Sequence, residues 1–175
     1  MQALLGILGL GLVGTFHLAD GIPVQPRFDY QRMEGMWHHI AMVNKGAEPD
    51  VVAGVIRIHP MPKGDLSVER NIVVRLACRA VNFRFRHADP PGKFTVFNAK
   101  GDQSNIHVVD TNYDGYLVLH TEIGQDTGLH LFARGLEVLD NIKEKFKGHV
   151  KSLGFSESDI QYPGKDEQCS MTDKS

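Results

Sequence analysis

This 175-residue chain has nine histidines and two cysteines, residue types that bind metal ions and act as nucleophiles or bases. His107 and His120 flank the turn sequence Tyr113-Asp114, and a two-residue hairpin loop would place them opposite each other on neighbouring strands. Facing Cβ atoms about 5 Å apart could hold a zinc ion. No acidic or cysteine side chain stands at a suitable spacing to complete such a site. We therefore expect neither a bound metal nor another cofactor.

The N-terminus carries an apolar run from Ala3 to Val13, which is too short to cross a bilayer as a helix. This run is typical of a secretory signal peptide, although no Lys or Arg precedes it. We expect cleavage after Ala19 or Gly21, so that residues 1–21 are the signal peptide. Residues 22–175 would then be a single secreted, extracellular domain. A buried N-terminal helix is the alternative, which the glycines of this segment disfavour.

The two cysteines are Cys78, in the middle of the chain, and Cys169, in the C-terminal tail. In the oxidising environment of secreted proteins we expect them to form one disulfide bond. Closing a loop of about 90 residues would stabilise the fold by about 4 kcal/mol in the chain-entropy model. Two thiols are the alternative, and a catalytic role for Cys169 is disfavoured because its surroundings are polar.

The charge balance narrows the choice of partner. Nineteen Lys and Arg residues against 21 Asp and Glu give a net charge of −2, and the basic residues are scattered along the chain. No strong field therefore favours nucleic acid or an anionic membrane. A hydrophobic content of 42% with 23% charged residues is ordinary for a soluble globular protein. We expect a monomer with no nucleic-acid partner and no stable membrane insertion.

The chain between Trp37 and Arg134 alternates apolar and polar residues with the period of a half-buried β-strand. For example, Leu66 and Val68 fall on one face and Ser67 on the other. Runs rich in Gly, Pro and Asp separate the segments. We expect strands after Trp37 and at residues 51–60, 66–77, 78–87, 92–99, 104–111, 115–123 and 128–135.

One amphipathic helix follows these strands. Gly154 is placed to cap this helix. The apolar residues recur every three or four positions and are Leu136, Leu139, Ile142, Phe146, Val150 and Leu153. Eight closely spaced strands and one late helix favour an all-β fold, an eight-stranded antiparallel up-and-down β-barrel with the helix packed outside. An immunoglobulin-like sandwich is the alternative, but it would not explain the helix.

Three sequence features together resemble the lipocalin family: a Gly-x-Trp sequence at Gly35 and Trp37, the sequence TNYDGY at residues 111–116, and Arg134 at the end of the last strand. The resemblance implies that the tryptophan plugs the closed end of the barrel and that the arginine packs across its indole. It also implies a cavity, or calyx, that carries a small hydrophobic molecule. The residues to which it assigns structural roles are Gly35, Trp37, Thr111, Tyr113 and Arg134.

The chain looks most like the branch of that family that contains a prostaglandin D synthase, neutrophil lipocalin and the epididymal lipocalins. In the synthase a cysteine on the second strand is the nucleophile. Aligning the second strand through Pro60 puts Gly54 at that position. Glycine has no nucleophile, so we expect a protein that is not an enzyme, and prostaglandin isomerisation is the disfavoured alternative.

The alternation and a family-like register predict which residues face the cavity. They are His39, Ile56, Val68, Arg70, Ile72, Val81, Phe83, Phe85, Ile106, Val108, Leu119, Thr121, His130 and Phe132. Most are apolar, and Arg70 would favour a carboxylate-bearing ligand such as a fatty acid or retinoic acid over retinol. The alternatives are that Arg70 extends to the rim, and that His39 and His130 are hydrogen-bonded barrel residues.

These observations predict a secreted carrier of a small hydrophobic molecule with an acidic head group. The alternative is a signalling protein that acts through a cell-surface receptor, with its barrel filled by aromatic side chains such as Phe83, Phe85, Phe94 and Phe97. A β-bulge in the first or second strand would reverse the predicted faces beyond it.

Overall fold

The computed structural model describes residues 21–46, 54–74 and 77–163, with side chains left undescribed at residues 72–74, 77 and 78. The expected signal peptide up to residue 20 and Cys169 lie outside the described residues, as do the side chains of Cys78 and Ile72. Within the described part of the chain, no helix is long and apolar enough to cross a membrane.

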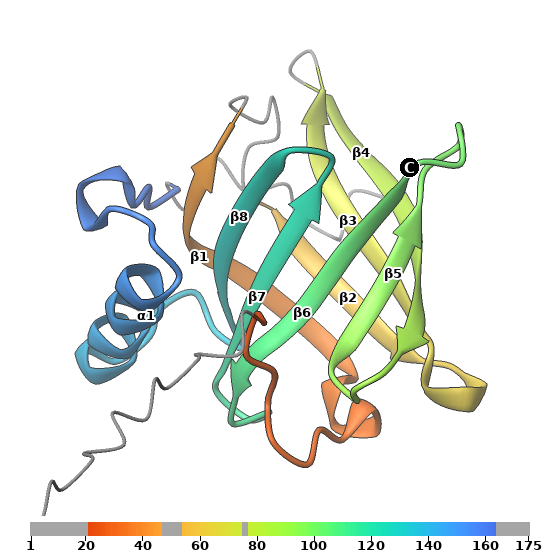
Figure 1. Cartoon of the computed structure of the whole chain (residues 1–175), viewed down its shortest axis with the longest axis horizontal. Helices are drawn as coiled ribbons and strands as arrows, with labels where there is room; N and C mark the ends of the chain where they lie inside the picture. The colour runs from red at the N-terminus through yellow and green to blue at the C-terminus, as the bar shows by residue number, and fades with distance from the viewer. Residues whose placement is uncertain (1–20, 47–53, 75–76, 164–175) are drawn as a thin grey trace, which may run out of the picture.

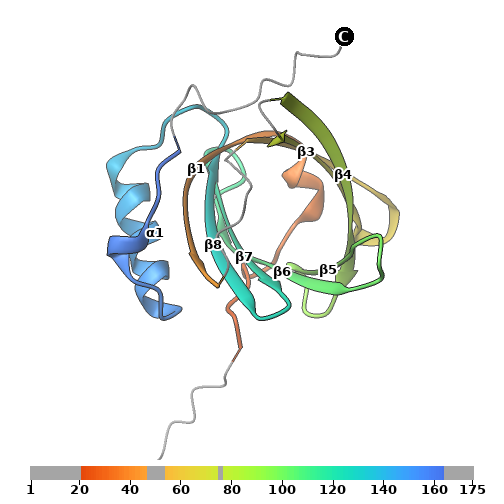
Figure 2. The ribbon, with the colours of Figure 1, turned by 90° about the horizontal axis from the view of Figure 1, so that it is seen from above.

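Eight antiparallel strands form a closed barrel in which each strand pairs with its neighbours in sequence and β8 pairs back to β1 (Figure 1, Figure 2). The fold class predicted from the sequence is therefore confirmed. The strands are β1 (Gly35–Lys45), β2 (Val55–Pro60), β3 (Leu66–Val74), β4 (Ala77–Ala88), β5 (Lys93–Phe97), β6 (Gln103–Thr111), β7 (Tyr116–Ile123) and β8 (Asp126–Ala133).

Short helical segments complete the fold. The α-helix α1 (Asp140–Ser152) lies outside the barrel, on the side of β1 and β8 (Figure 2). The 3-10 turn η1 (Tyr30–Met33) precedes β1 and lies across one end of the barrel, whereas η2 (Pro62–Gly64) joins β2 to β3 and η3 (Glu157–Asp159) follows α1.

The start of the helix differs from the prediction. Leu136 and Leu139 are 52% and 74% exposed and precede α1, which begins at Asp140. The reason is the anchoring of Arg134 at the end of the barrel. The chain must travel from there to the barrel wall before Phe146 can pack, and an irregular connection covers that distance.

The end of the helix is as predicted. Gly154 has φ +76° and donates its N–H to the Lys151 carbonyl at 3.0 Å, and Phe155 donates to the Val150 carbonyl at 2.9 Å. These two bonds form a Schellman motif, which needs a left-handed residue at this position. Phe155 and Val150 then pack in the same apolar cluster.

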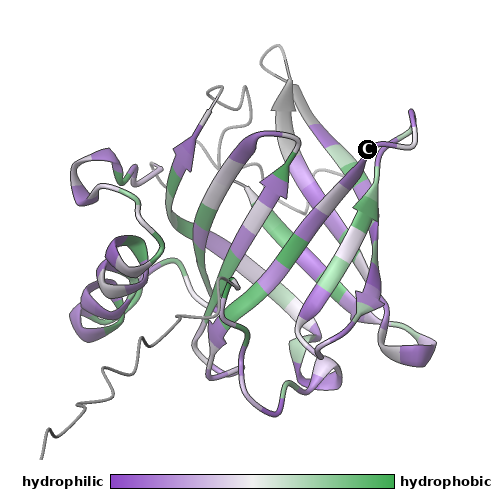
Figure 3. Cartoon of the chain, viewed as in Figure 1, coloured by the Kyte–Doolittle hydropathy of each residue, from purple (hydrophilic) through white to green (hydrophobic). Residues whose placement is uncertain are grey.

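Apolar side chains form two cores, one on each side of the barrel wall, in keeping with the alternating hydropathy along the strands (Figure 3). The inner core lies at the closed end of the barrel and includes Trp37, Phe94 and Leu117. The outer core joins the wall to α1 through Phe146 and Val150. Two-residue alternation along each strand is what allows one sheet to serve both cores.

A bulge in β1 moves that strand from one core to the other. The register with β8 shifts between His39 and Ala41. Trp37 and His39 precede the shift and face inward, whereas Ala41 and Val43 follow it and pack in the outer core. One extra residue is enough to reverse the face, because side chains alternate with a period of two.

The connection between β6 and β7 is longer than the predicted two-residue loop, because Thr111 pairs with Leu117. A bulge between Val108 and Asp110 then shifts the register by one residue, so His107 still pairs with His120 as expected. Within the turn, the Thr111 hydroxyl donates to the Tyr116 carbonyl at 2.7 Å and accepts from the Tyr113 N–H at 2.9 Å.

The closed end of the barrel is built on Trp37, which is fully buried and donates its indole N–H to the Met33 carbonyl at 2.9 Å. The Arg134 guanidinium lies over the indole, with Cζ 3.6 Å from the ring centroid. It also donates to the carbonyls of Tyr113, Met36 and Arg32 at 3.0, 3.2 and 3.2 Å. One side chain therefore ties η1, β1 and the β6–β7 turn to the end of β8.

The outer wall is joined to α1 by a charged cluster around Asp110. His149 Nε2 and Lys145 Nζ lie 2.9 and 2.7 Å from its carboxylate, and the Tyr116 hydroxyl donates to it at 3.0 Å. Burial raises the pKa of Asp110, but the hydrogen bonds from His149, Lys145 and Tyr116 outweigh it and lower the pKa to about 2.

Replacing Asp110 with Asn should lower the free energy of unfolding at pH 7 by about 2 kcal/mol, because the folded state holds this carboxylate ionised. The pKa of about 2 lies below the ordinary value of 3.8, so the contribution is complete above about pH 4. It is lost as the pH falls from about 4 to about 2. Urea unfolding of the wild type and of Asp110→Asn across that range measures the difference.

The matched control is Asp140→Asn, which changes an exposed carboxylate at the start of the same helix. We expect that variant to lose much less stability at pH 7 than Asp110→Asn, because solvent screens the exposed ion pair of Asp140 with Lys143. Equal stability of Asp110→Asn and wild type at pH 7 would contradict the assignment of the cluster as the fastening of α1.

Candidate functional site

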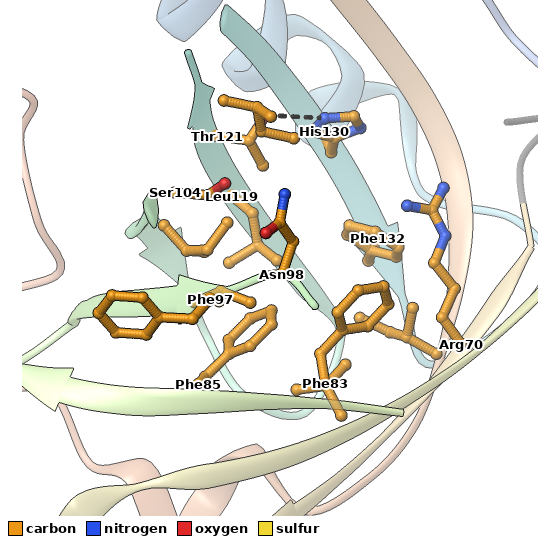
Figure 4. Close-up of a pocket in the computed structure, with 15 residues that line it drawn as sticks. Arg70, Phe83, Phe85, Phe97, Asn98, Ser104, Leu119, Thr121, His130 and Phe132 are labelled. Carbon is orange, nitrogen blue, oxygen red and sulfur yellow. Dashed lines mark hydrogen bonds between the residues drawn. The ribbon is translucent and has the colours of Figure 1, made fainter. Parts of the chain in front are cut away.

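The barrel encloses a cavity of about 310 Å³, which falls at the small end of ligand-binding pockets (Figure 4). Among the residues predicted to face inward, those that line it are Ile56, Val68, Arg70, Phe83, Phe85, Ile106, Leu119, Thr121, His130 and Phe132. They come from β2, β3, β4, β6, β7 and β8, so the cavity depends on closure of the whole barrel. Its surface is mostly apolar.

The remaining predicted residues lie elsewhere. Val108 is buried in the inner core, and His39 is fully buried behind Phe132 rather than on the cavity surface. Val81 pairs with Arg70 across β3 and β4 but does not line the cavity.

Several lining residues are absent from the predicted ligand contacts, namely Val96, Phe97, Asn98, Ser104 and Ile123, although Phe97 was named as an aromatic side chain that could fill the barrel. Ser104 and Ile123 pair across β6 and β7 and continue the inward parity of Ile106 and Thr121 by one further step. That parity could have revealed them. Phe97 and Asn98 lie at the end of β5, where regular alternation stops.

The aromatic side chains do not fill the barrel. Phe94 is fully buried and packs edge-on against Phe28, with ring centroids 5.9 Å apart. Phe83 and Phe97 are 37% and 43% exposed and line the cavity together with Phe85. Phe94 therefore belongs to the floor, and the other three leave space for an occupant.

Arg70 brings a positive charge to this apolar surface. It lies in β3 opposite Ile56 of β2, and its Nε is buried without a hydrogen-bond partner. Burial lowers the pKa of its guanidinium, which still remains charged at neutral pH. Within the described part of the chain, no carboxylate forms an ion pair with it. The exposed part of the side chain faces the cavity (Figure 4).

Two histidines and a threonine form a hydrogen-bonded chain beside Arg70. His39 Nε2 lies 3.2 Å from His130 Nδ1, and His130 Nε2 lies 3.3 Å from Thr121 Oγ1. The His39 ring also stacks on Phe132, with centroids 4.7 Å apart. Burial and the nearby Arg70 lower the pKa of His130 to about 3. Burial, followed by His130 and Arg70, also lowers the pKa of His39, so both imidazoles are neutral at pH 7.

His107 and His120 lie on the outside of the barrel with ring centroids 5.9 Å apart. Both are buried, and His120 packs against Phe155, which follows α1. Among the described residues, no group of three or more His, Cys, Asp or Glu side chains is placed to hold a metal ion. The pair therefore acts as part of the packing beneath the C-terminal segment.

Gly54, which the sequence resemblance placed at the nucleophile position of the synthase branch, has no space for a side chain. A Cβ built there would lie 2.1 Å from the carbonyl oxygen of Asn71 on β3. The Gly54 carbonyl also accepts a hydrogen bond from the His39 N–H at 3.3 Å. Any other residue would require a shift of the β3 backbone.

The model of the Lipocalin / cytosolic fatty-acid binding protein family matches residues 34–167. The chain belongs to the lipocalin family. This lipocalin is 34% identical over 178 residues to epididymal secretory protein 4 of Zootoca vivipara, a match that covers 98% of each chain. It is 26% identical to prostaglandin-H2 D-isomerase of Sus scrofa over 94% of this chain and 93% of that protein. The isomerase of Mus musculus is also 26% identical, over 94% of each chain.

Family membership and the cavity agree on the general activity. Lipocalins generally bind small hydrophobic molecules, and this lipocalin has an apolar cavity of suitable form inside a closed barrel. The relatives include both a protein named for secretion and proteins named as isomerases, so the distinction between carrier and enzyme depends on the site itself.

Gly54→Ala should lower the free energy of unfolding by about 1–3 kcal/mol, because the added methyl group forces the β3 backbone to move. Urea denaturation measures the change. Gly148→Ala is the matched control: the space around that helical glycine is open, so we expect a stability equal to or slightly above that of the wild type. A Gly54→Ala variant as stable as the wild type would show that this position tolerates a side chain.

Proposed function

We propose that this lipocalin is a secreted, non-catalytic carrier that holds a small hydrophobic molecule with a carboxylate head group inside its barrel. The observation that carries the proposal is the charge of Arg70 on an apolar cavity wall without an ion-pair partner among the described residues. A buried cation is costly unless an anion accompanies it. A ligand carboxylate would supply that anion through charge-assisted hydrogen bonds.

The apolar walls favour a hydrocarbon body for the ligand. Phe85, Leu119 and Phe132 offer aromatic and aliphatic surface around the cavity, and Phe83 and Phe97 extend this surface towards solvent. Removing a hydrocarbon chain from water provides most of the binding free energy, and the guanidinium selects the head group. Fatty acids and retinoic acid have this combination of groups, whereas retinol lacks the acid.

A carrier rather than an isomerase is supported by the position of Gly54. The residue has no nucleophile, and the Asn71 carbonyl occupies the space that a cysteine side chain would need. The polar groups that reach the cavity are a cation and neutral hydrogen-bonding groups, which suit binding.

Secretion is supported by the signal-peptide pattern of the sequence and by the relative named as a secretory protein. The disulfide between Cys78 and Cys169 belongs to the same proposal.

Arg70→Met should abolish the preference for acids, because it removes the charge and keeps much of the side-chain volume. We expect the wild type to bind retinoic acid about tenfold or more tightly than retinol. In Arg70→Met the two affinities should agree within about twofold. Quenching of the fluorescence of Trp37, the single tryptophan, measures both ligands on the same protein.

Arg57→Met is the matched control, since Arg57 lies on the neighbouring strand opposite Glu69 and does not line the cavity. It should retain the preference for retinoic acid. Equal affinities of the wild type for acid and alcohol, or an acid preference that persists in Arg70→Met, would contradict the proposed head group. If the wild type binds neither compound, retinoids are excluded as ligands. The affinities for hexadecanoic acid and hexadecanol are then compared in the same variants.

A further inference from the structure

The cavity has a second polar position besides Arg70. Thr121 and His130 line it, and Figure 4 shows the hydrogen bond between their side chains on the same cavity wall as Phe132. Behind them, His39 extends the chain into the fully buried interior. The cavity surface is therefore mostly apolar, with a charged position at Arg70 and a neutral hydrogen-bonded pair at Thr121 and His130, besides the polar side chains of Asn98 and Ser104.

Gly128 marks the point where the neutral polar groups converge. A Cβ built on it would lie 2.4 Å from Asn44 Oδ1, 2.9 Å from His130 Nε2 and 3.0 Å from Thr121 Oγ1. The absence of a side chain at this residue of β8 lets the three polar groups approach one another. Asn44 lies on β1, opposite Gly128 of β8. It follows the bulge in β1, after which the even-numbered side chains of that strand face the inside of the barrel.

The hydrogen bonds of this chain fit two proton arrangements. Each neutral imidazole has one N–H and one acceptor nitrogen. If Nδ1 of His130 holds the proton, it donates to His39 Nε2, and His130 Nε2 accepts from the Thr121 hydroxyl. If Nε2 of His130 holds the proton, it donates to Thr121 Oγ1, and the Thr121 hydroxyl donates to the Gly128 carbonyl.

Thr121 therefore faces the cavity as an acceptor. In either arrangement its single hydroxyl proton has an acceptor within the protein, which is His130 Nε2 at 3.3 Å or the Gly128 carbonyl at 3.5 Å. The lone pairs of Oγ1 that remain can accept a hydrogen bond from a ligand. A hydroxyl group can donate such a bond, whereas a ketone or a carboxylate cannot.

We propose that the ligand is a monocarboxylic acid that also carries a hydroxyl group, with its carboxylate at Arg70 and its hydroxyl donating to Oγ1 of Thr121. This inference rests on the proposed function and narrows it to a class of hydroxylated lipid acids. A second carboxylate is disfavoured because the neutral chain of His39, His130 and Thr121 offers it no counter-charge. An unsubstituted fatty acid binds more weakly because it leaves the Thr121 acceptor desolvated and unpaired.

The test compares ligands that share one chain length. Tetradecanoic acid, a positional series of monohydroxytetradecanoic acids and tetradecanedioic acid are titrated against the full mature protein by calorimetry. We expect at least one monohydroxy acid to bind about tenfold more tightly than tetradecanoic acid, the difference that one buried hydrogen bond makes. The dicarboxylic acid should bind no more tightly than tetradecanoic acid.

Variants then locate the preference. In Thr121→Val the monohydroxy acid and tetradecanoic acid should bind within about twofold of each other, and Thr121→Ser should restore the preference. Ser104→Ala removes a different cavity hydroxyl and should leave the preference intact.

The outcomes separate this inference from the proposed function. Tight binding of tetradecanoic acid that Arg70→Met weakens, with no gain for any monohydroxy acid, would overturn the inference and leave the carrier function standing. A preference that survives in Thr121→Val would also overturn it. Failure of all the acids to bind would count against the proposed function itself.

Discussion

The stacking of Arg134 on Trp37 is the interaction on which the rest of the structure depends. A guanidinium 3.6 Å from the indole centroid gives a cation–π contact, and its N–H groups satisfy three backbone carbonyls from separate parts of the chain. The barrel is therefore closed at this end by an apolar floor held in place from outside. A calyx that opens at one end only requires such a floor, because a cavity open at both ends would fill with water.

The same barrel wall serves different purposes on its two faces. Outside, Asp110 holds α1 through charged hydrogen bonds around an apolar contact. Inside, Arg70 is left without an ion-pair partner among the described residues, and the histidines beside it are kept neutral. Paired charge stabilises the fold on the outer face, while unpaired charge on the inner face is suited to a ligand. This difference is the main physical argument for a binding function.

Much of the fold follows from local patterns in the sequence. Two-residue alternation identifies the strands and places Val68, Arg70 and Phe83 towards the cavity, and this parity is independent of distant contacts. The pattern failed where tertiary contacts decide the outcome. Leu136 and Leu139 fit a helical period, but the anchoring of Arg134 keeps them out of the helix. The length of the β6–β7 connection was also wrong, because the bulge near Val109 cannot be recognised from composition.

The residues of the candidate site were also predictable only in part. Parity gives the face of a side chain, but it does not tell whether a charge will find a partner. The unpaired state of Arg70, the bond between His39 and His130, and the convergence of Asn44 and Thr121 at Gly128 all arise between strands that are distant in sequence. Asn44 in particular faces the cavity side only because a bulge precedes it in β1. These contacts carry the chemistry of the site.

The most direct test of the account is native mass spectrometry of the protein isolated from the tissue fluid that contains it, followed by organic extraction and identification of what is released. We expect one small molecule per chain, with a hydrocarbon body and a carboxylic acid. A chain that is empty in independent preparations, or one that carries only neutral lipid, would contradict the central claim that this barrel is a carrier of lipid acids.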